Sequence, residues 1–102
     1  MGLEYSGELS DTNGSVYLSG PQNVSTTETE AMVGGSAEPS RQFVRIHNKG
    51  SQTVYFGPTG VTSLTGEPLK KNQSVEIAAR DSIGVFLVTD SGTATVIVQE
   101  IG

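Results

Sequence analysis

The segment VRIHNKGSQTVYFGPTGVT, residues 44–62, has the clearest pattern in this chain of 102 residues. Apolar and polar side chains alternate before NKGS and again after it, and such alternation is typical of a half-buried β-strand. The glycine within NKGS predicts a turn between the two strands. The segment therefore predicts a β-hairpin, followed by a glycine-proline stop. The side chains that we expect to face the core are Val44, Ile46, Val54 and Phe56.

Three further strand patterns follow in the C-terminal half of the chain, namely QSVEIAA at 73–79, IGVFLVT at 83–89 and TATVIVQEI at 93–101. A long connection, residues 59–72, separates them from the hairpin, and we expect Val61, Leu64 and Leu69 to anchor this connection to the core. No window has a sustained helical period with caps. The sequence therefore predicts an all-β fold, a small antiparallel β-sandwich or barrel.

Residues 1–41 have a different composition, rich in Ser, Thr, Gly and Glu, with only short apolar patches. SVYLSG, at 15–20, reads as one short strand, and the rest shows no sustained period. A segment of this kind buries too little apolar surface to order itself. The sequence therefore predicts an extended N-terminal arm over 1–41, which is either mobile or ordered by a partner, and a β-sandwich domain over 42–102.

The charge distribution excludes some partners. The net charge is −5, and the six basic residues are scattered, whereas nucleic-acid binding needs clustered Lys and Arg. No apolar run approaches the length of a membrane helix, and the N-terminus lacks the features of a signal peptide. The chain contains no cysteine. We therefore expect no nucleic-acid partner, no membrane partner, and synthesis and use without secretion.

Two of the predicted strands are apolar on both faces, which indicates that both faces are covered. A small β-sandwich contains no helix that could cover the second apolar face of these strands. Small cores without disulfides or metals often need oligomerisation. The alternative is that these side chains are scattered apolar residues on the surface. The pattern favours a homo-oligomer whose subunit interface contains Phe86, Val88, Ile97 and Ile101.

Three sequence features bear on possible chemistry. His47 is the only histidine, and nothing in the sequence brings it to Asp81, Asp90 or a serine as a catalytic group would require. DTNGS, residues 11–15, resembles the start of a calcium loop, but Gln22 stands where the closing glutamate is needed. Exposed aromatics favour the alternative of a sugar-binding sandwich, although such residues are more often cross-strand pairs. The sequence thus nominates no catalytic residue, no metal ligand and no cofactor.

The order of elements in residues 44–101 resembles a β-module of tailed-phage virion proteins. In that module a strand ending in N.G precedes S..VY.G, a GVT...G.PL loop, a polar turn, sVEI and a final GTA.V.V strand. The chain keeps this order, with Lys71 and Asn72 where a Pro-Gly turn is usual. The matching residues of the loop are Gly57, Gly60, Val61, Thr62, Gly66, Pro68 and Leu69.

The resemblance implies a non-enzymatic head-decoration (cement) protein. Such a protein binds the major capsid protein on the outer surface of the phage head, and trimers suit the threefold positions of an icosahedral shell. The N-terminal arm is then the segment that docks on the capsid by β-augmentation. A fibre or tail accessory module, or a free carbohydrate-binding sandwich, is the alternative. The residues expected to carry capsid docking are Leu3, Tyr5, Leu9, Val16 and Leu18.

Overall fold

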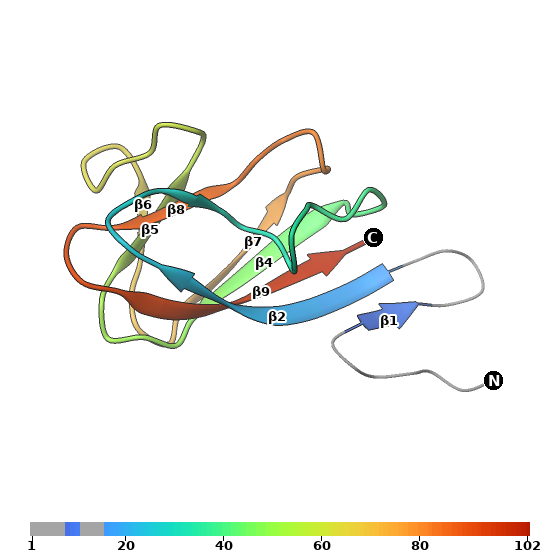
Figure 1. The fold of residues 1–102 in the computed structure, drawn as a ribbon, viewed down its shortest axis with the longest axis horizontal. Coiled ribbons are helices and arrows are strands. Elements are labelled where there is room, and N and C mark those ends of the chain that lie inside the picture. The colour runs from blue at the N-terminus through green and yellow to red at the C-terminus, as the bar shows by residue number, and fades with distance from the viewer. Residues whose placement is uncertain (1–7, 11–15) are drawn as a thin grey trace.

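The structure is a computed structural model that describes residues 8–10 and 16–102. Within these residues the chain forms strands and turns but no helix, which confirms the predicted all-β sandwich. Five strands form one antiparallel sheet, sheet A, in the order β1-β2-β9-β4-β7, and four form sheet B, in the order β3-β8-β5-β6 (Figure 1). The strands are β1 (Glu8–Ser10), β2 (Val16–Val24), β3 (Thr29–Glu30), β4 (Phe43–Asn48), β5 (Val54–Gly57), β6 (Glu67–Leu69), β7 (Ser74–Ala78), β8 (Phe86–Thr89) and β9 (Ala94–Ile101).

The predicted hairpin of β4 and β5 is wrong, although both strands exist. β4 pairs with β7 and β9 in sheet A, whereas β5 pairs with β6 and β8 in sheet B. The chain between them therefore crosses from one sheet to the other, and the apolar faces of the two strands meet across the core. Alternation alone could not distinguish these arrangements, since a hairpin and a crossover need the same apolar faces.

Asn48 and Gly50 shape this crossover. The buried Asn48 side chain donates to the carbonyl oxygens of Gln52 (2.8 Å) and Leu69 (2.9 Å) and accepts from the backbone N–H of Gly50 (2.9 Å). A Cβ at Gly50 would lie 2.8 Å from the Cβ of Ala94, because the turn packs directly on β9. Asn48 and Gly50 thus close a turn that packs on β9 of the same sheet and is bonded to Leu69 of the other sheet.

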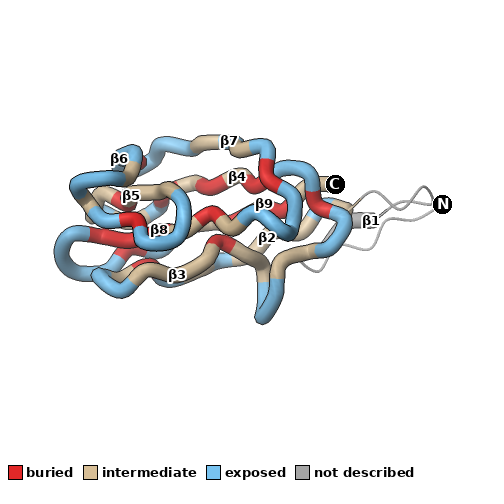
Figure 2. The backbone as a smooth tube through the Cα atoms, turned by 90° about the horizontal axis from the view of Figure 1, so that it is seen from above, coloured by how far each residue is buried: buried red, intermediate tan, exposed pale blue. Residues whose placement is uncertain are grey.

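The core lies between the two sheets and consists mainly of valine and other small aliphatic side chains. In the tube view the buried positions follow the middle of both sheets, while the turns at the ends are exposed (Figure 2). Phe56, Val75 and Ile77 are only partly buried beside this core. The buried apolar cluster is Val24, Ala31, Val44, Ile46, Val54, Leu69, Ala79, Val85, Leu87, Ala94, Val96 and Val98.

The described part of the predicted arm belongs to the sandwich, so the expected boundary at 41/42 needs correction for residues 16–41. β2 is nine residues long and pairs with β9 from Tyr17 to Val24. Val24 and Ala31 lie in the core, and β3 pairs with β8 in the other sheet. The sequence pattern did not predict the full length of β2, because glycine, proline and polar residues interrupt the alternation of this strand. The pairing of β2 depends on β9, a strand some eighty residues away.

The loop that follows β5 folds back over the outer face of sheet B. Val61 is 5% exposed and occupies the space above Gly57 and Gly66. A Cβ at Gly66 would lie 2.7 Å from the Cγ2 of Val61 and 2.9 Å from the Cβ of Tyr55. The motif glycines therefore let Val61 approach the sheet. Of the three residues predicted to anchor the connection, Val61 and Leu69 are buried. Leu64 is 94% exposed, so the prediction that it contacts the core was wrong.

Asn72 shapes the turn between β6 and β7. Asn72 has a φ of 65°, the left-handed conformation that glycine adopts freely and that asparagine tolerates better than other residues. The backbone N–H of Gln73 donates to the carbonyl of Lys70 (3.0 Å), and the Gln73 side chain accepts from the Lys70 N–H (2.8 Å). Asparagine is therefore a suitable residue for the left-handed position of this turn.

Candidate functional site

The outer face of sheet A carries a row of apolar side chains that runs across the strands. Tyr17 on β2 lies opposite Ile101 on β9, and Ile101 lies opposite Phe43 on β4. Side chains of directly opposed residues stand on the same face of a sheet, about 5 Å apart. Phe43 also lies opposite Ala78 on β7, so the row reaches the edge strand.

These side chains are open to solvent although they are large and apolar. Tyr17 and Phe43 are each 37% exposed, and Ile101 between them is half-buried. Burying a side chain of this size in an interface contributes roughly 1.5–3 kcal/mol before association costs are subtracted. The row is therefore the part of this face that would gain most from a partner.

A second, shorter row of side chains, with Ile97 at its centre, lies on the same face, and a row of polar side chains separates it from the first. Pro21 lies opposite Ile97, and Ile97 lies opposite His47. His47 shares a hydrogen bond with the hydroxyl of Ser74 (Nδ1 to Oγ, 3.3 Å) on the exposed surface. The histidine is thus one of the surface side chains of this face. The polar row between the two apolar ones consists of Ser19, Gln99, Arg45 and Glu76.

The predicted interface residues separate into two groups. Ile97 and Ile101 both point to the outer face of sheet A, as the alternation of β9 predicted. Phe86 and Val88 lie in sheet B, on the side that the loop after β5 covers. Val88 is only 5% exposed because this loop, with Val61, lies over it. The expectation that another subunit covers Val88 is therefore corrected, since the chain covers it.

The predicted capsid-docking residues also separate. Val16 and Leu18 lie within β2 and are half-buried, with Leu18 opposite Glu100, whose side chain points to the interior. These two are therefore part of the sheet rather than of an arm. Leu9 lies in β1 and is the register partner of Tyr17. Leu3 and Tyr5 lie outside the described residues, as does the calcium-like motif at 11–15.

A buried ion pair was missed at the sequence level. The Arg41 Nη1 donates to the Glu100 Oε2 at 2.8 Å, and both side chains are fully buried. Arg41 also donates to the carbonyl oxygens of Ala79 (3.1 Å) and Ile83 (2.9 Å). Longer bonds of 3.4 and 3.3 Å reach the carbonyl oxygens of Ala31 and Arg80.

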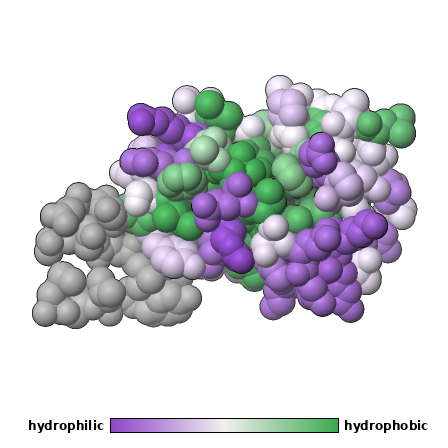
Figure 3. Space-filling view, turned by 180° about the vertical axis from the view of Figure 1, so that it is seen from behind, coloured by the Kyte–Doolittle hydropathy of each residue, from purple (hydrophilic) through white to green (hydrophobic). Residues whose placement is uncertain are grey.

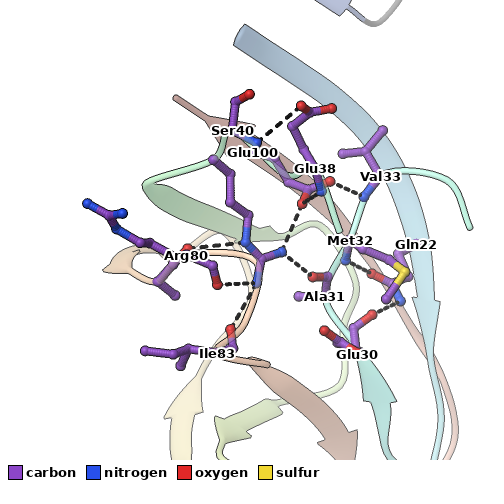
Figure 4. A network of polar contacts seen from close by, with 12 residues as sticks. Gln22, Glu30, Ala31, Met32, Val33, Glu38, Ser40, Arg80, Ile83 and Glu100 are labelled. Atoms are coloured by element: carbon purple, nitrogen blue, oxygen red, sulfur yellow. Dashed lines mark hydrogen bonds and ion pairs between the residues drawn. The ribbon is translucent and has the colours of Figure 1, made fainter. Parts of the chain in front are cut away.

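The carboxylate of Glu100 is equally well bonded. It accepts the backbone N–H groups of Val33 (2.8 Å) and Glu38 (2.9 Å) in addition to Arg41 (Figure 4). No buried side-chain nitrogen or oxygen lacks a partner in residues 8–10 and 16–102. The network therefore ties two loops to β9 and has a structural role. The signal was present in the sequence, because the inward register of Ala94, Val96 and Val98 continues to Glu100.

The structure gives no support to a metal site or a membrane span within the described residues. Among the described residues no three His, Cys, Asp or Glu side chains gather as metal ligands would. The described part of the chain also contains no helix long and apolar enough to cross a membrane. The outer face of sheet A is thus the candidate site that the geometry favours.

No protein-family model matches this chain, and no curated protein matches it in sequence. Among solved structures, the chain is similar to a protein from Ralstonia eutropha JMP134 that has the provisional name mannose-6-phosphate isomerase. That match has a TM-score of 0.48 and 14% identity and covers 92% of this chain and 80% of that chain. At this TM-score and identity the likeness says nothing about what this chain does.

Proposed function

We propose that this chain is a non-enzymatic structural protein of a phage virion, a head-decoration protein that binds the outer surface of the capsid as a homotrimer. Two observations support the proposal. The order of motifs in residues 44–101 resembles that of phage virion modules, and the outer face of sheet A presents a flat apolar row to solvent. A decoration protein needs such a face, because its task is to cover an extended surface.

The row of Tyr17, Ile101 and Phe43 is the observation that carries the proposal. Aromatic side chains near the centre of an interface supply a disproportionate share of its binding energy. In this role the row contacts the major capsid protein, and the polar side chains beside it set the register of docking. β1 is the edge strand of the same sheet. In this proposal the preceding residues, with Leu3 and Tyr5, add to the contact with the capsid.

The experiment mixes the purified protein with expanded, undecorated capsids and measures co-sedimentation and the resistance of the shell to heat. We expect saturable binding and a more resistant shell. Tyr17→Ser and Phe43→Ser should each weaken binding by about thirtyfold, which is the effect of losing an aromatic hot spot of about 2 kcal/mol. Leu64→Ser is the matched control, because Leu64 is exposed but lies in a loop away from sheet A. Capsid binding that is absent, or equally strong in all three variants, would contradict the proposal.

A free carbohydrate-binding sandwich is the second candidate, since two exposed aromatic side chains share one flat face. A fibre or tail accessory role is the third, and it differs only in the position of the protein on the particle. Light scattering separates the trimer from a monomeric sugar-binding module. Labelling of intact virions separates the head from the tail.

A further inference from the structure

The edge of the sandwich between β6 and β7 is open. β7 is the last strand of sheet A and β6 the last strand of sheet B, and they lie on the same side of the molecule (Figure 2). In the view from behind, which faces this side, apolar side chains gather in the middle and polar ones surround them (Figure 3). The partly buried side chains here are Phe56, Val75 and Ile77. The groove at this edge lies between the two sheets and shares only the edge strand β7 with the outer face of sheet A.

Two adjoining hollows form a groove along this edge. One, of about 350 Å³, is lined by Phe56, Ile77 and Val85 among others. The other, of about 340 Å³, is lined by Phe56, Leu69 and Val75 among others. Val75 and Ile77 are two residues apart on β7, and each belongs to one hollow. The hollows therefore follow one another with the spacing of alternate residues in a strand.

The backbone of β7 has a free edge beside this groove. The Gln73 carbonyl accepts from the N–H of Asn48 (2.9 Å), and the Ala79 N–H donates to the Gln42 carbonyl (3.0 Å). Bonded and non-bonded positions alternate in an antiparallel ladder, so the odd-numbered residues of β7 bond to β4. The even-numbered residues direct their N–H and C=O groups away from β4, where no other described strand pairs with them. They are Ser74, Glu76 and Ala78.

The charges around the groove are acidic. Glu67 lines both hollows. Glu76 stands on β7 between Val75 and Ile77, with its side chain on the outer face of sheet A, opposite Arg45. The one ion pair in the described part of the chain is that of Arg41 and Glu100. The Arg45 guanidinium donates to the Ser74 hydroxyl (3.2 Å). Neither Glu67 nor Glu76 is therefore held in an ion pair with a described residue. Lys70 and Lys71 lie in the turn beyond β6 and line neither hollow. A basic side chain on an added strand, placed beside Glu76 at the outer rim of the groove, is therefore the complementary charge.

From this arrangement we propose that the open edge binds an extended segment of another protein by β-strand addition to β7. The segment carries two apolar side chains at positions i and i+2, one for each hollow, and a Lys or Arg between them that faces Glu76. Backbone hydrogen bonds supply affinity in this mode, and the side-chain hollows supply specificity. The proposal concerns a second surface and does not depend on the capsid-binding proposal.

The N-terminal segment of a second copy of this chain is the other occupant to consider. Leu3 and Tyr5 have the required spacing, but Glu4 stands between them. In the register that fills both hollows Glu4 would lie opposite Glu76, and like charges directly opposite each other destabilise a strand pair. Charge therefore favours a basic segment from a different protein.

The test uses the full chain labelled with ¹⁵N and the synthetic peptide acetyl-Gly-Ser-Val-Lys-Val-Ser-Gly-amide. We expect saturable shifts of the β7 amides and new protection from hydrogen exchange at Ser74, Glu76 and Ala78. The peptide with Glu in place of Lys should bind about tenfold more weakly, as the loss of one charge pair predicts. The peptide with Ser in place of both Val residues should not bind.

Two variants separate strand addition from other contacts. Ala78→Pro removes an N–H that points away from β4, so the ladder within the sheet persists while binding weakens about five- to tenfold, as for one lost hydrogen bond. Ala78→Ser keeps the N–H and should bind like the wild type. Glu76→Lys should reverse the preference, so that the Glu peptide binds more tightly than the Lys peptide.

Three results would overturn the proposal. One is an absence of saturable shifts with the Lys peptide, and another is binding by Ala78→Pro that equals binding by Ala78→Ser. The third is a change in the chemical shifts of the β7 amides with protein concentration, in the absence of any peptide, that disappears when residues 1–7 are removed. This result would show that the groove binds the N-terminal segment of a second copy.

Discussion

Arg41 and Glu100 form a fully buried ion pair, 2.8 Å from Nη1 to Oε2, which joins the start of β4 to the end of β9. The two residues are 59 positions apart in the sequence. Each also bonds to backbone groups of the loops that cross the end of the sandwich. The pair therefore holds in place two loops, the one that contains Val33 and Glu38 and the one that follows β7. Neither loop has regular strand pairing of its own at these residues.

We predict that breaking this pair costs more than any exposed substitution. Arg41→Met should lower the free energy of unfolding by about 3–5 kcal/mol, because it leaves the Glu100 carboxylate buried and uncompensated. Urea denaturation monitored by circular dichroism measures the change. Arg45→Met is the control, since Arg45 lies on the outer face of sheet A, and it should change stability by less than about 0.5 kcal/mol. Similar losses in the two variants would contradict the structural role of the pair.

We predict that Val61 holds its loop onto sheet B. Val61→Ala removes two buried methyl groups and should cost about 1.5 kcal/mol, at about 0.8 kcal/mol for each group. Leu64→Ala, in the same loop, removes a larger side chain that is 94% exposed and should change stability by less than about 0.5 kcal/mol. Thermal unfolding of both variants provides the comparison. A larger loss for Leu64→Ala would show that the loop is anchored differently.

We predict that Gly66 is required because of space rather than backbone conformation. A Cβ there would lie 2.7 Å from the Val61 side chain and 2.9 Å from Tyr55, so Gly66→Ala should cost about 1–3 kcal/mol through overpacking. Gly35→Ala is the matched control, because nothing lies within 4 Å of a Cβ at that position. If denaturant midpoints fall equally for the two variants, the close approach of Val61 is not the cause.

We predict that the residues before β1 contribute to capsid binding and not to the stability of the sandwich. Removing residues 1–7, with Leu3 and Tyr5, should weaken binding to undecorated capsids at least about tenfold, or about 1.4 kcal/mol. The melting temperature should stay within about 2 °C of that of the full chain, since a change of 1 kcal/mol would shift it by several degrees. Undiminished capsid binding by the shortened chain would exclude a role for these residues in docking.

Local patterns predicted much of the fold correctly. Alternation identified strands at β4, β5, β7, β8 and β9, and it assigned Val44, Ile46 and Val54 to the core, where they are fully buried. The same alternation in β9 placed Ile97 and Ile101 on the outer face of sheet A. These predictions succeeded because the two faces of a strand are set by the residues themselves.

Predictions that depended on distant partners failed. β4 and β5 look like a hairpin, but each pairs within a different sheet. β2 looks short and interrupted, yet it extends over nine residues because β9 supplies its hydrogen bonds. The loop after β5, with Val61, buries Val88, and only the tertiary structure shows this contact.

By itself, the sequence determined the class of the fold, the apolar face of each strongly patterned strand and the positions of the glycines and asparagine that make its turns. These features follow from local sterics and from the two-residue period of a strand. Only the tertiary structure decided which strands pair and which faces remain uncovered. It also decided that Arg41 meets Glu100 and that Tyr17, Ile101 and Phe43 form one row. The physical reason is that strand pairing and burial depend on residues that lie close in space and far apart along the chain.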